Sequence, residues 1–358
     1  MTQKRLLSYD AVRVVAVMMI VMIHVSAYVV QYDKDPASLT FAVGNVFNGL
    51  SRAGTPMFLM LSGALLLNED RKMDARTFYR RNLTGIVLLL LFWLFFYAAW
   101  RAVLLPWIQG MPADPVLFRD YLLRLRGPRQ HLWYLFMLVG AYLVIPVLRL
   151  FVKRENKNYI LGLILLSIVV QFGVRTGGLL TRDLSFTLED FVTKFHVEYA
   201  TGYLPYLLIG WYLTAFPPRG WARAALPAAG IAALVFQILA VRFLIGAVPD
   251  IRDYMMEMDT LPAMVYGAGL FAWITGHFEG RETKSKVIAG LSRRSFGIYI
   301  THVFLLDILI GLLFPYTAFG EQHPLVYTIV LYVSGFCAAF LVSLCLSKVK
   351  GLRKLVRG

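Results

Sequence analysis

Long apolar stretches alternate with short polar segments along nearly the whole chain. Stretches of about 20 mainly apolar residues have the length that crosses a bilayer as a helix. The pattern predicts about ten spans, near residues 11–30, 46–67, 83–105, 132–151, 159–175, 197–215, 222–246, 261–277, 295–314 and 325–346. No loop between them is long enough for a folded soluble domain. We therefore expect residues 1–358 to form a single all-α domain, a polytopic integral membrane helical bundle.

Composition and charge agree with this prediction. The chain is 58% hydrophobic and 16% charged, whereas soluble domains average about 45–50% apolar and about 25% charged residues. The net charge of +15 is spread over short loops between the spans, which argues against nucleic acid as a partner. Basic residues concentrate in every second loop and in the tail, so both termini are predicted to be cytoplasmic.

The segment 106–131 departs from this charge pattern. It carries Arg119, Arg124, Arg126 and Arg129 but lies on the outer side in the predicted topology. Two interpretations stay open: a solvated amphipathic loop, or a basic surface that attracts an anionic acceptor such as a lipid-linked saccharide phosphate.

The first predicted span carries three polar residues, Asp10, Arg13 and His24. Arg13 and His24 are eleven residues apart, which is about 1100° of helix rotation, so they share a face about 16 Å apart. Asp10 precedes Arg13 by three residues and lies on the same face. Ionisable groups inside a membrane are costly and usually mark a functional site. The alternatives are that Arg13 extends to the headgroups and that His24 only bonds a neighbouring helix. Asp10 would either orient Arg13 or cap the helix start, and we favour the cap.

Five segments in order resemble motifs of membrane acyltransferase family 3. They are Asp10–His24, Pro56–Leu67, the His131-Leu132-Trp133 run, Tyr203–Tyr212 and Ser295–His302. One position departs from the family pattern, because Met57 stands where a second aromatic residue is usual. The resemblance covers essentially the whole chain.

The resemblance implies O-acylation in the bacterial cytoplasmic (inner) membrane. The donor would be cytoplasmic acyl-CoA, most simply acetyl-CoA, and the acceptor a hydroxyl of a cell-envelope polysaccharide or lipid-linked saccharide. His24 would act as the base, since histidine, with an ordinary pKa of about 6.5, is mostly neutral at pH 7. Arg13 would pair with a coenzyme phosphate. The further candidates for donor or substrate binding are Asp10, Arg52, Ser62, His131, Trp133, Tyr299 and His302.

Several of these candidates have a structural alternative. Arg52 would serve the acceptor or the oxyanion, or would only extend to the interface. Ser62 lacks the surroundings of a nucleophilic serine, and a Ser-Gly pair more often permits close helix packing. His302 would orient the donor or His24, or would form a plain interhelical bond.

A saccharide transporter or flippase is the alternative function. About ten spans and intramembrane charges would suit it, but we find no inverted repeat in the sequence. The histidines lack the paired spacing of metal ligands, so no metal is predicted. Cys337 and Cys345 are expected to be core thiols rather than a disulfide.

Overall fold

A computed structural model describes residues 5–71, 74–123, 130–180, 203–248, 251–258 and 260–356. These residues form helices, and the only extended pairing among them is one antiparallel bridge between Leu6 and Glu282. The all-α prediction is therefore confirmed for the described part of the chain.

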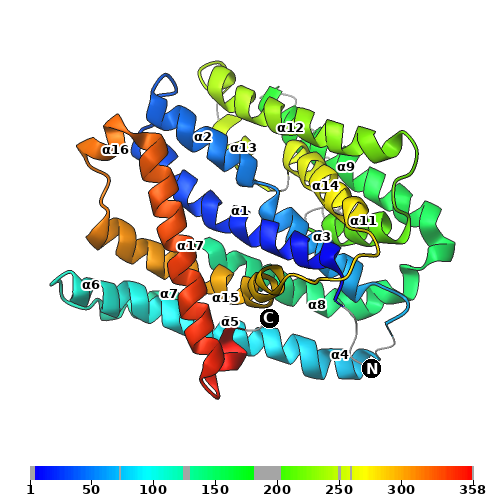
Figure 1. The fold of residues 1–358 in the computed structure, drawn as a ribbon, viewed down its shortest axis with the longest axis horizontal. Coiled ribbons are helices and arrows are strands. Elements are labelled where there is room, and N and C mark those ends of the chain that lie inside the picture. Colours follow the sequence, from blue (N-terminus) through cyan, green and yellow to red (C-terminus); the bar gives the residue numbers. More distant parts are fainter. Residues whose placement is uncertain are drawn as a thin grey trace.

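Helix α1 (Leu7–Tyr32) runs through the middle of the bundle (Figure 1). It packs against α2 (Leu39–Ser51), α3 (Gly54–Leu66), α14 (Leu261–His277), α15 (Lys286–Ile308) and α17 (Pro324–Lys348). Small and β-branched side chains such as Val12, Ala16 and Val17 are fully buried in these contacts. Because small side chains let helices approach closely in a membrane, α1 can be enclosed on several sides at once.

Within the described part of the chain, six continuous helical segments are long and apolar enough to cross a membrane. They are Leu7–Tyr32, Ala75–Ile108, Trp133–Phe151, Ala222–Leu244, Lys286–Leu313 and Pro324–Lys348. Each coincides with one of the predicted spans. The count of ten is not reached, partly because the predicted span 46–67 is divided between α2 and α3, and partly because α14 has only 17 residues. The predicted span 197–215 falls partly outside the described residues.

The other helical elements connect or flank these spans. Three are π-helical turns, namely η1 (Tyr79–Leu83), η2 (Trp100–Leu104) and η6 (Leu309–Leu313). The α-helices are α4 (Ala75–Phe78), α5 (Thr84–Ala99), α6 (Leu105–Ile108), α7 (Pro115–Leu123), α8 (Trp133–Phe151), α9 (Lys157–Leu180), α11 (Leu204–Ala215), α12 (Ala222–Leu244), α13 (Ile251–Met255) and α16 (Ala318–Gln322). The 3-10 turns are η3 (Gln130–Leu132), η4 (Arg154–Asn156) and η7 (Leu352–Val356).

We call the end of the bundle where α1 and α15 begin, near Arg5 and Arg281, the basic end. The backbone N–H of Leu7 donates to Arg281 O at 2.8 Å, and the indole N–H of Trp93 donates to Leu355 O at 3.1 Å. The start of α1 therefore lies beside the loop that precedes α15, and the C-terminal turn η7 lies against α5 and α15. The cytoplasmic location of both termini stays a prediction.

The Ser62-Gly63 pair serves close packing, as one of the two interpretations predicts. A Cβ placed on Gly63 would lie 1.9 Å from the Leu207 carbonyl oxygen, and one on Gly210 would lie 1.8 Å from the Met60 oxygen. Helices α3 and α11 thus touch backbone to backbone, which only glycine permits at these two positions.

The prediction for the two cysteines is wrong. Cys337 and Cys345 are exposed on α17 rather than part of the core. An apolar span in a membrane protein can present its thiols to lipid at no hydrophobic cost, so apolar surroundings in the sequence do not imply burial in the protein.

Candidate functional site

Three predicted histidines meet inside the bundle, and we call them the histidine cluster. His24 comes from α1, His131 from η3 and His302 from α15. Their ring centroids are 4.9 Å apart for His24 and His302, 5.7 Å for His131 and His302, and 6.2 Å for His24 and His131. His302 is fully buried and His131 is 3% exposed, whereas His24 is half-buried.

The backbone fixes the proton on the His302 ring. Its Nδ1 lies 2.5 Å from the carbonyl oxygen of Tyr299. A carbonyl oxygen only accepts hydrogen bonds, so Nδ1 carries the proton and Nε2 of the neutral ring keeps a lone pair. Among the described residues, buried Nε2 has no hydrogen-bond partner. His302 therefore presents an acceptor in the interior of the bundle.

Two tyrosines hold the backbone and ring of His131 in place. The Tyr299 hydroxyl donates to the His131 carbonyl oxygen at 2.6 Å, and the Tyr97 ring lies 4.6 Å from the His131 ring. The Tyr97 hydroxyl donates to Ile300 O at 2.7 Å. Tyr299 was predicted from the resemblance, but Tyr97 was not, because it lies in a uniformly apolar run. The sequence signal that could have identified Tyr97 is its polar hydroxyl group within an otherwise apolar segment.

Asp10 joins α1 to α15 at the basic end. Its carboxylate accepts hydrogen bonds from Arg5 Nη2 at 2.6 Å, Ser292 Oγ at 2.6 Å and Thr283 Oγ1 at 2.7 Å. Arg13 Nη1 lies 3.6 Å from the same carboxylate. The expectation that Asp10 caps the helix is wrong: α1 begins at Leu7, its N-cap has no side-chain hydrogen bond, and Asp10 lies within the first turns. Arg5 and Thr283 bind it there instead.

Arg13 is placed differently from a lipid-facing cation. Its side chain is 32% exposed and its guanidinium is oriented by Asp10. Because α1 is one continuous helix from Leu7 to Tyr32, Arg13 and His24 lie on one face about 16 Å apart along its axis. Arg13 thus stands between the basic end and the histidine cluster.

A second polar network lies where α2 meets α3. The Arg52 guanidinium donates twice to Asn48 Oδ1, at 2.8 and 2.6 Å, and Asn48 Nδ2 donates to Ser26 Oγ at 3.2 Å. Arg52 is 8% exposed, so it does not simply extend to the interface. Ser26 follows His24 by two residues on α1. Through Asn48 and Ser26, the buried Arg52 guanidinium is therefore connected to α1 at about the same depth as the histidine cluster.

Two other predicted residues make contacts outside the histidine cluster. The Ser62 hydroxyl donates to Phe58 O at 2.9 Å within its own helix. The Trp133 ring packs against the Tyr203 ring at 5.1 Å. The basic residues Arg124, Arg126 and Arg129 of the outer segment lie outside the described residues, whereas Arg119 is exposed on α7. Among the described residues, no group of three or more His, Cys, Asp or Glu is arranged to hold a metal ion.

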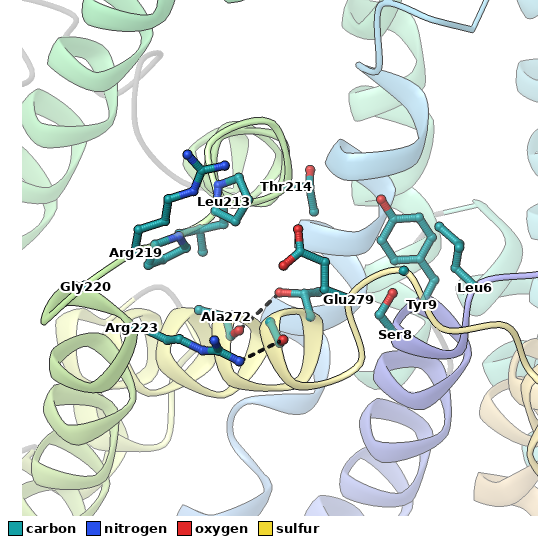
Figure 2. A pocket seen from close by; sticks show the side chains of 15 residues that line it. Leu6, Ser8, Tyr9, Leu213, Thr214, Arg219, Gly220, Arg223, Ala272 and Glu279 are labelled. Carbon is teal, nitrogen blue, oxygen red and sulfur yellow. Dashed lines mark hydrogen bonds between the residues drawn. The ribbon is translucent and has the colours of Figure 1, made fainter.

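Two cavities of about 360 Å³ each open near the basic end. The first, the basic-end cavity, lies between the starts of α1 and α12 and the end of α14. Figure 2 shows Arg219 and Arg223 on one side of it, with Glu279 and Tyr9 toward the other. The second, the α5 cavity, lies between α3, α5, α8 and α15. Its lining residues are Phe58, Ser62, Arg81, Asn82, Gly85, Ile86, Leu89, Tyr134, Leu138, Tyr142, Ser295, Phe296 and Tyr299.

Comparison with known proteins adds one finding. A family model described as an acyltransferase domain matches residues 6–348, which is nearly the whole chain. No curated protein matches the chain, and no solved structure matches it.

Proposed function

Since this chain belongs to acyltransferase family 3, we propose that it is a membrane O-acyltransferase of the bacterial cytoplasmic (inner) membrane. It transfers an acyl group from cytoplasmic acyl-CoA, with acetyl-CoA as the expected donor, to a hydroxyl of a cell-envelope polysaccharide or lipid-linked saccharide. The observation that supports this most directly is the histidine cluster, which places an imidazole in the bundle interior on the same helix face as Arg13.

In the proposed reaction, His24 acts as the general base. It takes the proton of the acceptor hydroxyl while the hydroxyl oxygen attacks the thioester carbonyl carbon. The C–S bond then breaks, and the thiolate of coenzyme A recovers a proton from His24. His131 and His302 border His24, and the unpaired Nε2 of His302 can accept a proton from a donor placed against it. A buried site excludes the water that would otherwise hydrolyse the thioester.

Arg13 and Arg52 supply positive charge on the two sides of His24. Arg13, held by Asp10 near the basic end, is suited to a phosphate of the coenzyme. Arg52, buried beside Asn48, is suited to the developing oxyanion or to the acceptor. This division gives the donor and acceptor separate approaches to His24.

The chain also resembles the O-acetyltransferase of enterobacterial common antigen in the opening of α1 and in residues 51–56. That resemblance favours acetyl as the transferred group and a surface carbohydrate as the acceptor. Trp133 at the start of α8 packs against Tyr203 and offers an aromatic surface of the kind that packs against sugars.

The test compares purified wild type with His24→Ala in nanodiscs with radiolabelled acetyl-CoA. We expect both proteins to bind acetyl-CoA with similar affinity, while acyl turnover falls by about 100-fold or more in the variant because a general base is lost. Turnover at the wild-type rate in His24→Ala would contradict its role as base. If neither protein binds acetyl-CoA, the donor is wrong and transport of a saccharide without coenzyme becomes the better function.

A second variant tests the donor role of Arg13. We expect Arg13→Ala to raise the apparent KM for acetyl-CoA by about tenfold, since a charge-assisted contact to phosphate is lost, and to leave the KM for the acceptor unchanged. Arg154→Ala is the matched control, because Arg154 is an exposed arginine at the same end. Equal donor kinetics in Arg13→Ala and Arg154→Ala would exclude the phosphate contact.

A further inference from the structure

We infer that the α5 cavity binds the phosphopantetheine arm of the acyl donor, with its phosphate at Arg81 and its thioester directed to the histidine cluster. This inference rests on the proposed function and assigns its donor site to a particular cavity. It goes beyond the expectation that Arg13 pairs with a coenzyme phosphate, because the cavity is lined by α3, α5, α8 and α15 rather than by α1.

The charge of the cavity fits an anionic, elongated ligand. Arg81 and Asn82 lie just before α5, near the basic end. Of the thirteen described residues that line the cavity, none is acidic. Apolar side chains such as Ile86 and Leu138 form its walls. The side chains of Asn82 and Ser295 offer hydrogen-bonding groups for the two amides of a pantetheine arm, which would otherwise lose their bonds to water.

The mouth of the cavity is built on the π-helical turn η1, Tyr79–Leu83. A π-helical turn inserts one extra residue into a helix and changes the direction of the side chains that follow, and such turns are frequent at functional sites. Here the turn carries both Arg81 and Asn82, and both line the cavity. A regular helix would rotate these two side chains relative to Ile86 and Leu89, which line it farther in.

The cavity leads toward the site of the chemistry. From Asn82 to Leu89, seven residues along the helix correspond to about 10 Å of depth. At the deep end, the Tyr299 ring lies 5.4 Å from the Tyr134 ring, and the Tyr299 hydroxyl donates to the His131 carbonyl oxygen. The Tyr299 ring also lies 5.9 Å from the His131 ring and 6.3 Å from the His302 ring, so this side chain borders both the cavity and the histidine cluster. Movement of the Tyr299 ring would admit a thioester.

The basic-end cavity fits this ligand less well. Glu279 lines the same cavity across from Arg219 and Arg223 (Figure 2), and its negative charge partly cancels theirs. From α1 and the residue before it, only Leu6, Ser8 and Tyr9 contribute, and no member of the histidine cluster is among the described residues that line it. An arm bound there would point into the first turns of α1 rather than to His24.

Gly85 offers a selective way to fill the α5 cavity. It lines the cavity, and a Cβ added to it would meet nothing within 4 Å. A larger side chain at this position would therefore occupy the space in which we place the ligand, without colliding with the protein. Gly140 on α8 is the matched control, because a Cβ there also meets nothing within 4 Å but the residue is exposed and outside the cavity.

The experiment measures binding of radiolabelled acetyl-CoA to wild type, Gly85→Ala, Gly85→Leu and Gly140→Leu, each in nanodiscs. We expect Gly85→Leu to raise the Kd at least about tenfold, the usual cost of overfilling a packed site, while Gly85→Ala and Gly140→Leu change it less than about twofold. In a Gly85→Cys variant with Cys337 and Cys345 replaced by alanine, acetyl-CoA should slow maleimide labelling.

The inference would be overturned if Gly85→Leu kept the wild-type affinity for acetyl-CoA and acetyl-CoA did not slow the labelling of Gly85→Cys. The proposed function would still stand in that case, provided that wild type binds acetyl-CoA. Loss of acceptor use with normal acetyl-CoA affinity would also overturn it, since the cavity would then serve the acceptor. Failure of wild type to bind any phosphopantetheine thioester would refute both. Parallel assays with acetyl-phosphopantetheine and an acetylated carrier protein identify whether the arm arrives on coenzyme A or on a protein.

Discussion

Replacing Asp10 by alanine tests how the basic end is held together. The Asp10 carboxylate is 3% exposed and accepts hydrogen bonds from Arg5, Thr283 and Ser292, with Arg13 at 3.6 Å. Three of these partners lie in different parts of the chain: the segment before α1, the loop before α15, and α15 itself. Asp10→Ala therefore removes the acceptor that joins them.

The size of the stability loss depends on which hydrogen-bonding partners of Asp10 can bind water after the substitution. Arg5 is 37% exposed and Arg13 is 32% exposed, so both rehydrate after the change. Ser292 is 4% exposed and loses its acceptor without replacement. With about 1.5–3 kcal/mol for a hydrogen bond to a charged group and about 1–3 kcal/mol for an unsatisfied buried donor, we expect a loss of about 3 kcal/mol. Asp10→Asn keeps an acceptor oxygen and should lose about half as much.

The free energy of unfolding is measured by titrating SDS into mixed micelles and following tryptophan fluorescence. Asp253→Ala is the control, because Asp253 is 69% exposed and its one ion pair among the described residues is with its neighbour Arg252 at 3.1 Å. A change below about 0.5 kcal/mol is expected there. If Asp10→Ala is as stable as Asp253→Ala, the carboxylate does not join α1 to α15, and the contacts around it carry no stability.

Two further predictions concern packing and topology. Gly63→Ala should lower the free energy of unfolding by about 3 kcal/mol or more, because its Cβ would lie 1.9 Å from Leu207 O. Gly140→Ala should leave the free energy of unfolding unchanged, because its Cβ would meet nothing within 4 Å. Equal stability of the two variants in the same SDS titration would refute the backbone contact of α3 and α11. In a background where alanine replaces Cys337 and Cys345, an impermeant maleimide added outside the cell should label Arg119→Cys and spare Arg76→Cys, and the reverse pattern would invert the predicted topology.

The sequence predicted the elements that depend on period and length. The helical period placed Asp10, Arg13 and His24 on one face of α1, and hydropathy located the six long spans. These features are local, since they depend on residues within one helix. The division of span 46–67 at Arg52 was not predicted, although Ser51, Gly54 and Pro56 beside it are residue types common at helix boundaries. Arg52 contacts Asn48 within the same segment, and Asn48 contacts Ser26 on α1, which the hydropathy of one span does not reveal.

Relations between distant segments were harder to predict. The resemblance to known motifs selected His24, His131 and His302 separately, but nothing in the sequence measures the 4.9 Å between the rings of His24 and His302. Asp10 was expected to cap the helix or to orient Arg13, because its sequence neighbours suggest only these local roles. Its true partners Thr283 and Ser292 are more than 270 residues away. Similarly, the α5 cavity collects side chains from four helices, and no local pattern identifies it.

Helices α1 and α15 connect the basic end to the histidine cluster. Both run from the basic end, and on each the polar residues share a face: Asp10, Arg13 and His24 on α1, and Ser292, Tyr299 and His302 on α15. Two contacts then fix the axial position of α1 relative to α15. Asp10 contacts Ser292 at the basic end, and His24 contacts His302 in the interior. Because helices are stiff, a change in the first contact must alter the second unless the helices bend. The stability lost in Asp10→Ala should therefore be accompanied by lower acyl turnover, although Asp10 touches none of the three histidines.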